Sequence, residues 1–87
     1  MNELHKSNYI KTLGKMKAII VTKGNNRIEG KLFMVGDFVI ALEVDKQNID
    51  SQTIEAYYNE GISACEYSDD WRITVARRKV ESIEFVD

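Results

Sequence analysis

The sequence has a single cysteine, Cys65, and no apolar run long enough to cross a membrane. One cysteine excludes a disulfide within the chain, and a cytoplasmic setting is the default for such a protein. The longest apolar run extends from Phe38 to Leu42, far below the roughly 18 residues that a membrane helix requires. The stretch from Met1 to Lys6 lacks the apolar core of a secretory signal. We therefore expect a soluble cytoplasmic protein with no membrane partner.

Residues for catalysis or metal binding are equally scarce. The only histidine is His5, and there is no second histidine or cysteine that would complete a metal site with Cys65. The stretch from Gly24 to Lys31 differs from a phosphate-binding loop, because one residue too many separates its glycines and Leu32 replaces the required serine or threonine. We predict that the protein is not an enzyme and that it holds no metal and no cofactor.

The length of 87 residues limits the chain to a single domain, residues 1–87, with a thin core. A domain of this size buries roughly 60 to 65% of the surface that its unfolded chain exposes. Association into oligomers is one common way for small domains to bury more apolar surface. Oligomerisation is therefore an open expectation from length alone.

Charge is strongly segregated along the chain, although the net charge is only −2. Residues 1–36 hold seven basic and two acidic side chains, whereas residues 37–70 hold one basic and nine acidic side chains. Residues 71–87 hold four basic and three acidic side chains. Segregated charge can produce a basic surface that attracts polyanions. Two interpretations stay open, a binding surface of this kind and ordinary solvated faces.

The most informative stretch runs from Gly24 to Leu42. A turn signal at residues 23–26 precedes an alternating strand over residues 27–35, and a second turn signal at Gly36 precedes another strand over residues 37–45. A glycine within a strand indicates a sharp bend, so Gly30 favours a small, strongly curved barrel over a flat sheet. The residues expected to face the core are Ile28, Gly30, Leu32, Met34, Phe38, Ile40, Leu42 and Val44.

The rest of the chain supplies a helix and three further strands. We expect a helix over about residues 2–13 and strands over about 15–22, 70–77 and 80–86, with a bulge or turn after Val80. Residues 46–69 form a variable, acidic insertion. It contains either a short helix from Ser51 to Glu60 or a strand-and-turn excursion, and the sequence favours neither.

This order of elements resembles that of the Sm and Sm-like (LSm) family. The residues that carry the resemblance are the stretches Arg27–Leu32, Asp37–Leu42 and Arg77–Val80. The resemblance implies a mainly β fold, a small, strongly bent five-stranded antiparallel SH3-like barrel with an N-terminal α-helix. It further implies a homo-oligomeric ring, in which the fourth strand of one subunit pairs with the fifth strand of the next, with single-stranded RNA bound near the pore.

The resemblance also nominates site residues. In an alignment without a gap, Phe38 takes the place of the residue that stacks on a base. In an alignment with one inserted residue, Val39 and Ala41 take the places of the stacking side chain and the base-reading asparagine, and neither can perform those roles. The candidates for RNA contact are Arg77, Arg78, Lys79, Phe38 and Arg27. The candidates for the subunit interface are Ile73, Val75, Ile83 and Phe85.

Two functional hypotheses follow. The first is an Sm-like ring that binds single-stranded RNA around the basic corner at Arg77, Arg78 and Lys79, because guanidinium groups suit both phosphates and bases. The second is an oligomeric protein-interaction or structural module that binds no RNA and meets a protein partner through residues 46–70.

Overall fold

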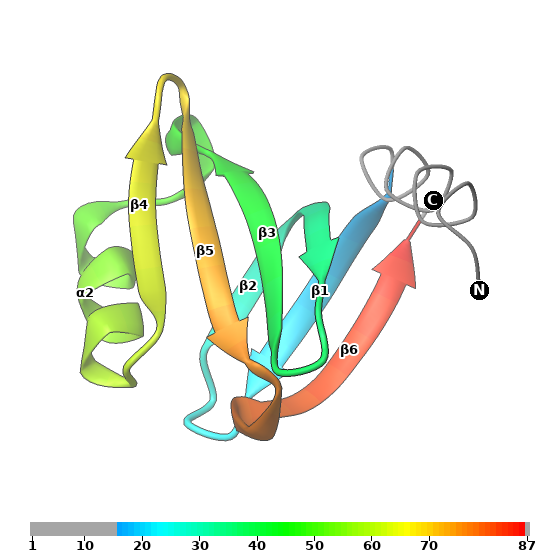
Figure 1. Ribbon diagram of the computed structural model, residues 1–87. Coiled ribbons are helices and arrows are strands. Elements are labelled where there is room, and N and C mark those ends of the chain that lie inside the picture. Colours follow the sequence, from blue (N-terminus) through cyan, green and yellow to red (C-terminus); the bar gives the residue numbers. More distant parts are fainter. Residues whose placement is uncertain (1–15, 87) are drawn as a thin grey trace.

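The computed structural model describes residues 16–86 of the chain (Figure 1). These residues form one antiparallel sheet of six strands in the order β4-β5-β3-β2-β1-β6, together with one α-helix. The helix expected over residues 2–13 lies outside the described residues. The strands are β1 (Lys17–Thr22), β2 (Arg27–Val35), β3 (Val39–Asp45), β4 (Ser63–Tyr67), β5 (Asp70–Ala76) and β6 (Val80–Val86). The helical segments are η1 (Lys46–Asn48), α2 (Ser51–Asn59) and η2 (Arg77–Lys79).

The mainly β antiparallel fold is confirmed, but the number of strands and the shape of the sheet differ from the expectation. The sheet has six strands, and within residues 16–86 it is not closed into a barrel, because β4 and β6 are its two edges. The extra strand comes from the insertion over residues 46–69, which contains both the short helix and a strand. The helix begins where Asp50 accepts a hydrogen bond from the Thr53 backbone N–H at 2.8 Å, a typical N-cap.

The bend at Gly30 is confirmed by its surroundings. Residues of β2 up to Lys31 pair with β1, and pairing with β3 begins at Lys31, so the strand passes from one neighbour to the other around Gly30. A Cβ atom there would lie 2.5 Å from the Glu43 carbonyl oxygen. Because β2 curves so strongly, the β1–β2 hairpin, the β2–β3 turn and η2 all lie at one end of the molecule (Figure 1).

Replacing Gly30 by alanine is expected to lower the free energy of unfolding by about 1 to 3 kcal/mol, as overpacking does in well-packed cores. The added methyl group would meet backbone of Glu43, which cannot move without disturbing β3. Urea unfolding checks this, with Gly36→Ala as the control, since a Cβ atom at Gly36 would have its nearest neighbour at 3.4 Å. Equal losses in the two variants would contradict the prediction.

A β-bulge in β2 explains one wrong assignment. The pairing of β2 with β3 shifts between Leu32 and Met34, so that the alternation changes phase. Met34 was expected to face the core, but it is exposed, whereas Val35 packs against the core. A second irregularity lies where Val21 pairs with Ser82 and the next residue of β1 pairs with Val80. It confirms the bulge expected after Val80.

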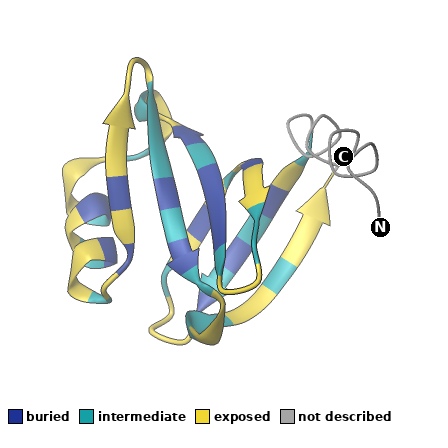
Figure 2. Cartoon of the chain, in the orientation of Figure 1, coloured by how far each residue is buried: buried dark blue, intermediate teal, exposed yellow. Residues whose placement is uncertain are grey.

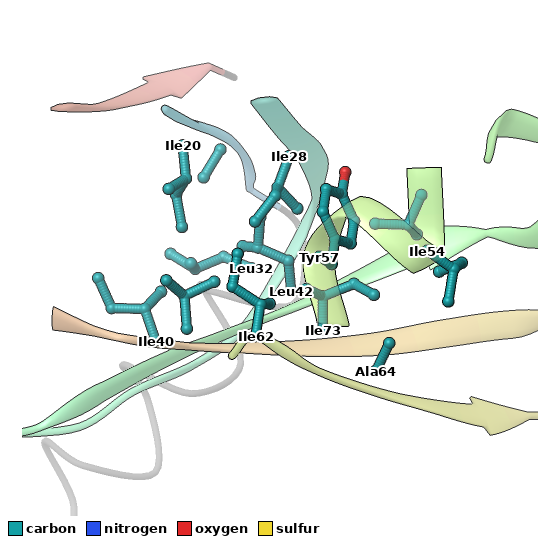
Figure 3. Packing of buried hydrophobic residues seen from close by; sticks show 13 residues of the cluster. Ile20, Ile28, Leu32, Ile40, Leu42, Ile54, Tyr57, Ile62, Ala64 and Ile73 are labelled. Carbon is teal, nitrogen blue, oxygen red and sulfur yellow. The ribbon is translucent and has the colours of Figure 1, made fainter. Parts of the chain in front are cut away.

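The core lies on the concave side of the curved sheet, where α2 covers one end (Figures 1 and 3). Ile54 and Tyr57 of α2 join the strand residues there, and Trp71 packs against the same cluster. Strand β6 contributes least, and most of its residues are exposed (Figure 2). The buried cluster comprises Ala18, Ile20, Ile28, Leu32, Ile40, Leu42, Val44, Ile54, Tyr57, Ile62, Ala64, Ile73 and Val75.

Candidate nucleic-acid interface

One end of the molecule gathers basic side chains and one exposed aromatic ring. We call it the basic end and define it as Lys23, Phe38, Arg77, Arg78 and Lys79. Its three segments are the β1–β2 hairpin, the β2–β3 turn and η2, which lie side by side (Figure 1). Backbone hydrogen bonds tie them together, from Lys23 N to the Lys79 carbonyl and from Arg77 N to the Phe38 carbonyl, each 2.8 Å long.

Phe38 is the most exposed large apolar residue of the described chain. It precedes β3 in the turn, and its exposed fraction is 83%, so its expected place in the core was wrong. Full burial of such a side chain is worth roughly 1.5 to 3 kcal/mol. The small core therefore gains almost nothing from this phenylalanine, which leaves its ring free to contact a partner.

Arg77 is bound to the turn that carries Phe38. Its Nε donates a hydrogen bond of 2.7 Å to the Gly36 carbonyl oxygen, in the same turn as Phe38. The bond uses the Nε donor, while the residue itself stays exposed. The turn that carries Phe38 thus anchors the Arg77 side chain through Nε and leaves its two Nη groups without a partner among residues 16–86.

The other two residues of the basic corner differ from each other. Arg78 is exposed and makes no hydrogen bond or ion pair with any residue of the range 16–86. The Lys79 Nζ instead donates to the Glu60 carbonyl oxygen at the end of α2, where a positive charge also offsets the helix dipole. Arg77 and Arg78 are therefore available to a ligand, and Lys79 has a structural role.

Glu60 fastens α2 to the hairpin of the basic end. Its carboxylate accepts hydrogen bonds from Thr22 Oγ1 at 2.5 Å, from Asn26 Nδ2 at 2.7 Å and from Gly24 N at 2.8 Å. Desolvation by burial raises the pKa of Glu60, but these hydrogen bonds and the charge of Lys79 outweigh it, so that the pKa lies below the usual 4.5. Sequence analysis missed this role, because nothing local to Glu60 indicates its distant partners.

Arg27, the remaining RNA candidate, is not part of this arrangement. Its guanidinium forms an ion pair of 3.2 Å with Glu29 on the same strand. It lines a separate groove of about 520 Å³ where β2 bends, together with Lys17, Gly30 and Tyr57 among others. The groove carries charges of both signs and does not match a simple anion site.

The interface candidates fall into two groups. Ile73 and Val75 are completely buried in the core of the chain itself, so their side chains offer no surface to a second subunit. On β6, Ile83 packs partly against that core, and Phe85 has an exposed fraction of 52%. The outer edge of β5, which the expected ring would use, is already paired with β4 over residues 63–67.

A second group of exposed rings lies on the convex face of the sheet, and sequence analysis did not identify it. The Arg72 guanidinium lies between two rings, with its Cζ 3.8 Å from the Phe33 centroid and 4.2 Å from the Tyr67 centroid. Its Nη2 also pairs with Glu43 Oε2 at 3.3 Å. We call Phe33, Arg72 and Tyr67 the aromatic platform.

Residues 16–86 contain neither a metal-binding cluster nor a membrane-spanning helix. Within residues 16–86, no group of three or more histidine, cysteine, aspartate or glutamate side chains is arranged to hold a metal ion. No helix of this part of the chain is both long enough and apolar enough to span a bilayer. Comparisons of the chain with protein-family models, with curated proteins and with solved structures found no match.

Proposed function

We propose that this protein binds single-stranded RNA at the basic end. In this proposal Phe38 stacks on a base, and Arg77 and Arg78 contact the neighbouring phosphates. The observation that carries it is the exposed ring of Phe38 on the β2–β3 turn, to whose backbone Arg77 donates two hydrogen bonds. A base stacked on an aromatic ring contributes about 1 to 3 kcal/mol. Arginine side chains add phosphate contacts that do not depend on sequence.

The proposal includes an Sm-like, five-stranded SH3-like arrangement of β1, β2, β3, β5 and β6. Its support is the chain order, the bend of β2 at Gly30 and the short η2 between the last two strands. A homo-oligomeric ring would have to use edges other than that of β5, because β4 occupies it. The two edges open within the described residues are those of β4 and β6.

Binding should weaken as salt rises, because phosphate contacts release counterions. Two contacts to a single strand predict a slope of about −1.4 in log affinity against log salt. A fourfold rise in salt should then lower affinity about sevenfold. Fluorescence anisotropy with a labelled U-rich RNA checks this. Arg78→Ala should reduce the slope by about half, whereas Arg27→Ala, outside the basic end, should leave it unchanged.

Two outcomes would count against RNA binding at the basic end. One is the absence of binding at low salt, and the other is an Arg27→Ala effect that equals or exceeds the Arg78→Ala effect. Native mass spectrometry of the same samples would report the number of subunits with and without RNA.

A second candidate function is an oligomeric protein-interaction module without RNA binding. The observation that favours it is β6, whose outer edge is unpaired within residues 16–86 and which carries the exposed Phe85 and Val86. Open edges readily pair with another strand. A closed oligomer that carries no RNA at either salt concentration would favour this function, with the segment over residues 46–70 as the next surface to test for a protein partner.

A further inference from the structure

The aromatic platform crosses the convex face of the sheet, and its rings are partly open to solvent. Phe33 on β2 and Tyr67 on β4 have exposed fractions of 39% and 51%, and Arg72 on β5 lies between them. An isolated pair of exposed rings on a small domain requires no explanation. Two rings ordered around one guanidinium group form a surface on which a planar group can stack.

The platform is already ordered without a ligand. Phe33 follows the core-facing Leu32 on β2 and therefore lies on the convex face, and the pair with Glu43 fixes the guanidinium of Arg72. The buried Nε of Arg72 has no hydrogen-bond partner within the described residues, so stacking and the Glu43 pair hold this side chain. Rings fixed in this way lose little conformational entropy when a ligand stacks on them.

The convex face connects the platform to the basic end. In the register of β3 with β5, Val39 pairs with Ala76, Ala41 with Thr74 and Glu43 with Arg72. The β5 residues on this face between Arg77 and Arg72 are therefore only Ala76 and Thr74, both small. The five-residue step from Arg77 to Arg72 spans roughly 16 Å of strand. No bulky side chain of β5 therefore separates the basic end from the aromatic platform.

Charge sets the far limit of this path. Beyond Tyr67 the β4–β5 turn carries Asp69, and Asp70 begins β5. These carboxylates repel phosphates, whereas Arg77 and Arg78 attract them at the opposite end. A bound single strand should therefore begin at the basic end and stop at the platform.

We propose that the convex face of β3 and β5 is a track for single-stranded RNA and that the aromatic platform stacks on a second base. This inference rests on the proposed function of the basic end. The track would hold about four nucleotides, the lower end of the range known for small β-barrel domains. Glu43 neutralises the guanidinium of Arg72, so the platform contributes stacking and not net charge.

The test combines RNA length with variants of the two aromatic sites. Oligouridines of two, five and ten nucleotides are titrated against the full chain, its Tyr67→Ala variant and its Phe38→Ala variant. The affinity of the parent chain should rise between the two- and five-nucleotide RNAs. It should then level off, once the larger number of overlapping positions on the ten-nucleotide RNA is taken into account. Tyr67→Ala should weaken binding of the five-nucleotide RNA on the order of tenfold and leave the dinucleotide unaffected.

Tyr58→Ala is the control, because Tyr58 is a similarly exposed tyrosine, at 53%, on α2. Since its hydroxyl donates to the Ala64 carbonyl of β4, both variants are titrated under conditions in which urea unfolding shows them fully folded. Suppose that Tyr67→Ala binds the RNAs of every length as tightly as the parent chain does, whereas Phe38→Ala binds each of them more weakly. The track is then overturned, and the proposed site at the basic end stands. If no length binds to the parent chain, both proposals are overturned. An equal loss in Tyr58→Ala and Tyr67→Ala would also overturn the track.

Discussion

Replacing Phe38 by alanine is expected to weaken RNA binding on the order of ten- to a hundredfold while the free energy of unfolding stays unchanged. The ring is 83% exposed, so its removal costs the core almost nothing, whereas the loss of one stacked base costs about 1 to 3 kcal/mol. Anisotropy titration with U-rich RNA measures the first quantity, and urea unfolding measures the second.

Two further substitutions at this position separate stacking from general apolar contact. Phe38→Tyr keeps an aromatic ring and should bind within a fewfold of the parent, whereas Phe38→Leu keeps apolar surface without a ring and should behave like alanine. If Phe38→Leu retained full affinity, stacking would not be the source of binding. If Phe38→Ala lowered stability, the ring would have a structural role.

Replacing Glu60 by alanine is expected to have the largest effect on stability, a loss of about 2 to 4 kcal/mol. The carboxylate accepts hydrogen bonds from Thr22, Gly24 and Asn26, and the Thr22 residue is only 2% exposed. Removing the acceptor leaves that buried hydroxyl without its partner, which costs more than an average hydrogen bond contributes. Thermal or urea unfolding measures the loss.

Glu55→Ala is the matched control, since it removes an exposed carboxylate from the same helix. It should change stability by no more than about 0.5 kcal/mol. A Glu60→Ala variant as stable as Glu55→Ala would show that the three hydrogen bonds contribute nothing net. A double-mutant cycle with Thr22→Val would isolate the Glu60–Thr22 pair.

The lowered pKa of Glu60 also predicts a pH dependence. Because the folded-state pKa lies below 4.5, the unfolded chain binds more protons in this range, and the stabilising contribution is complete only above about pH 4.5. It is lost as the pH falls through the folded-state pKa. Glu60→Gln should therefore lose less stability than the parent on acidification from pH 5 to pH 3. The stability of Glu60→Gln should still fall somewhat with pH, because hydrogen bonds from Thr53 lower the pKa of Asp50 as well.

Local patterns predicted much of this fold. Alternation located β2, β3 and β5 to within two residues at either end. Gly30 indicated the bend, because a glycine within a strand marks a bend or a close approach of backbone, and the Glu43 backbone does lie against it. Alternation failed at the bulge beside Met34, where one inserted residue reverses every later assignment on the strand. The aromatic platform was not recognised for another reason, because Phe33, Arg72 and Tyr67 come from three strands whose order in the sheet the sequence does not show.

Contacts between distant segments were beyond sequence reasoning. Phe38 and Arg77 were both candidates, but their contact depends on η2 lying beside the β2–β3 turn. The roles of Lys79 and Glu60 depend on where α2 ends relative to the hairpin. The insertion gave signals for a helix and for a strand because it contains both, and only pairing with β5 shows that β4 extends the sheet.

The pairing of β1 with β6 has a consequence for how the chain folds. It joins residues 17–22 to residues 80–86, so the two paired strands are separated in the sequence by nearly the whole described chain. Contacts of such long sequence separation slow folding, because loop-closure entropy is lost before they form. During synthesis β1 can pair with β2 early, but its other edge has to wait until β6 has left the ribosome. The sheet is therefore completed only after residues 80–86 have emerged, and until then β1 exposes an unpaired edge.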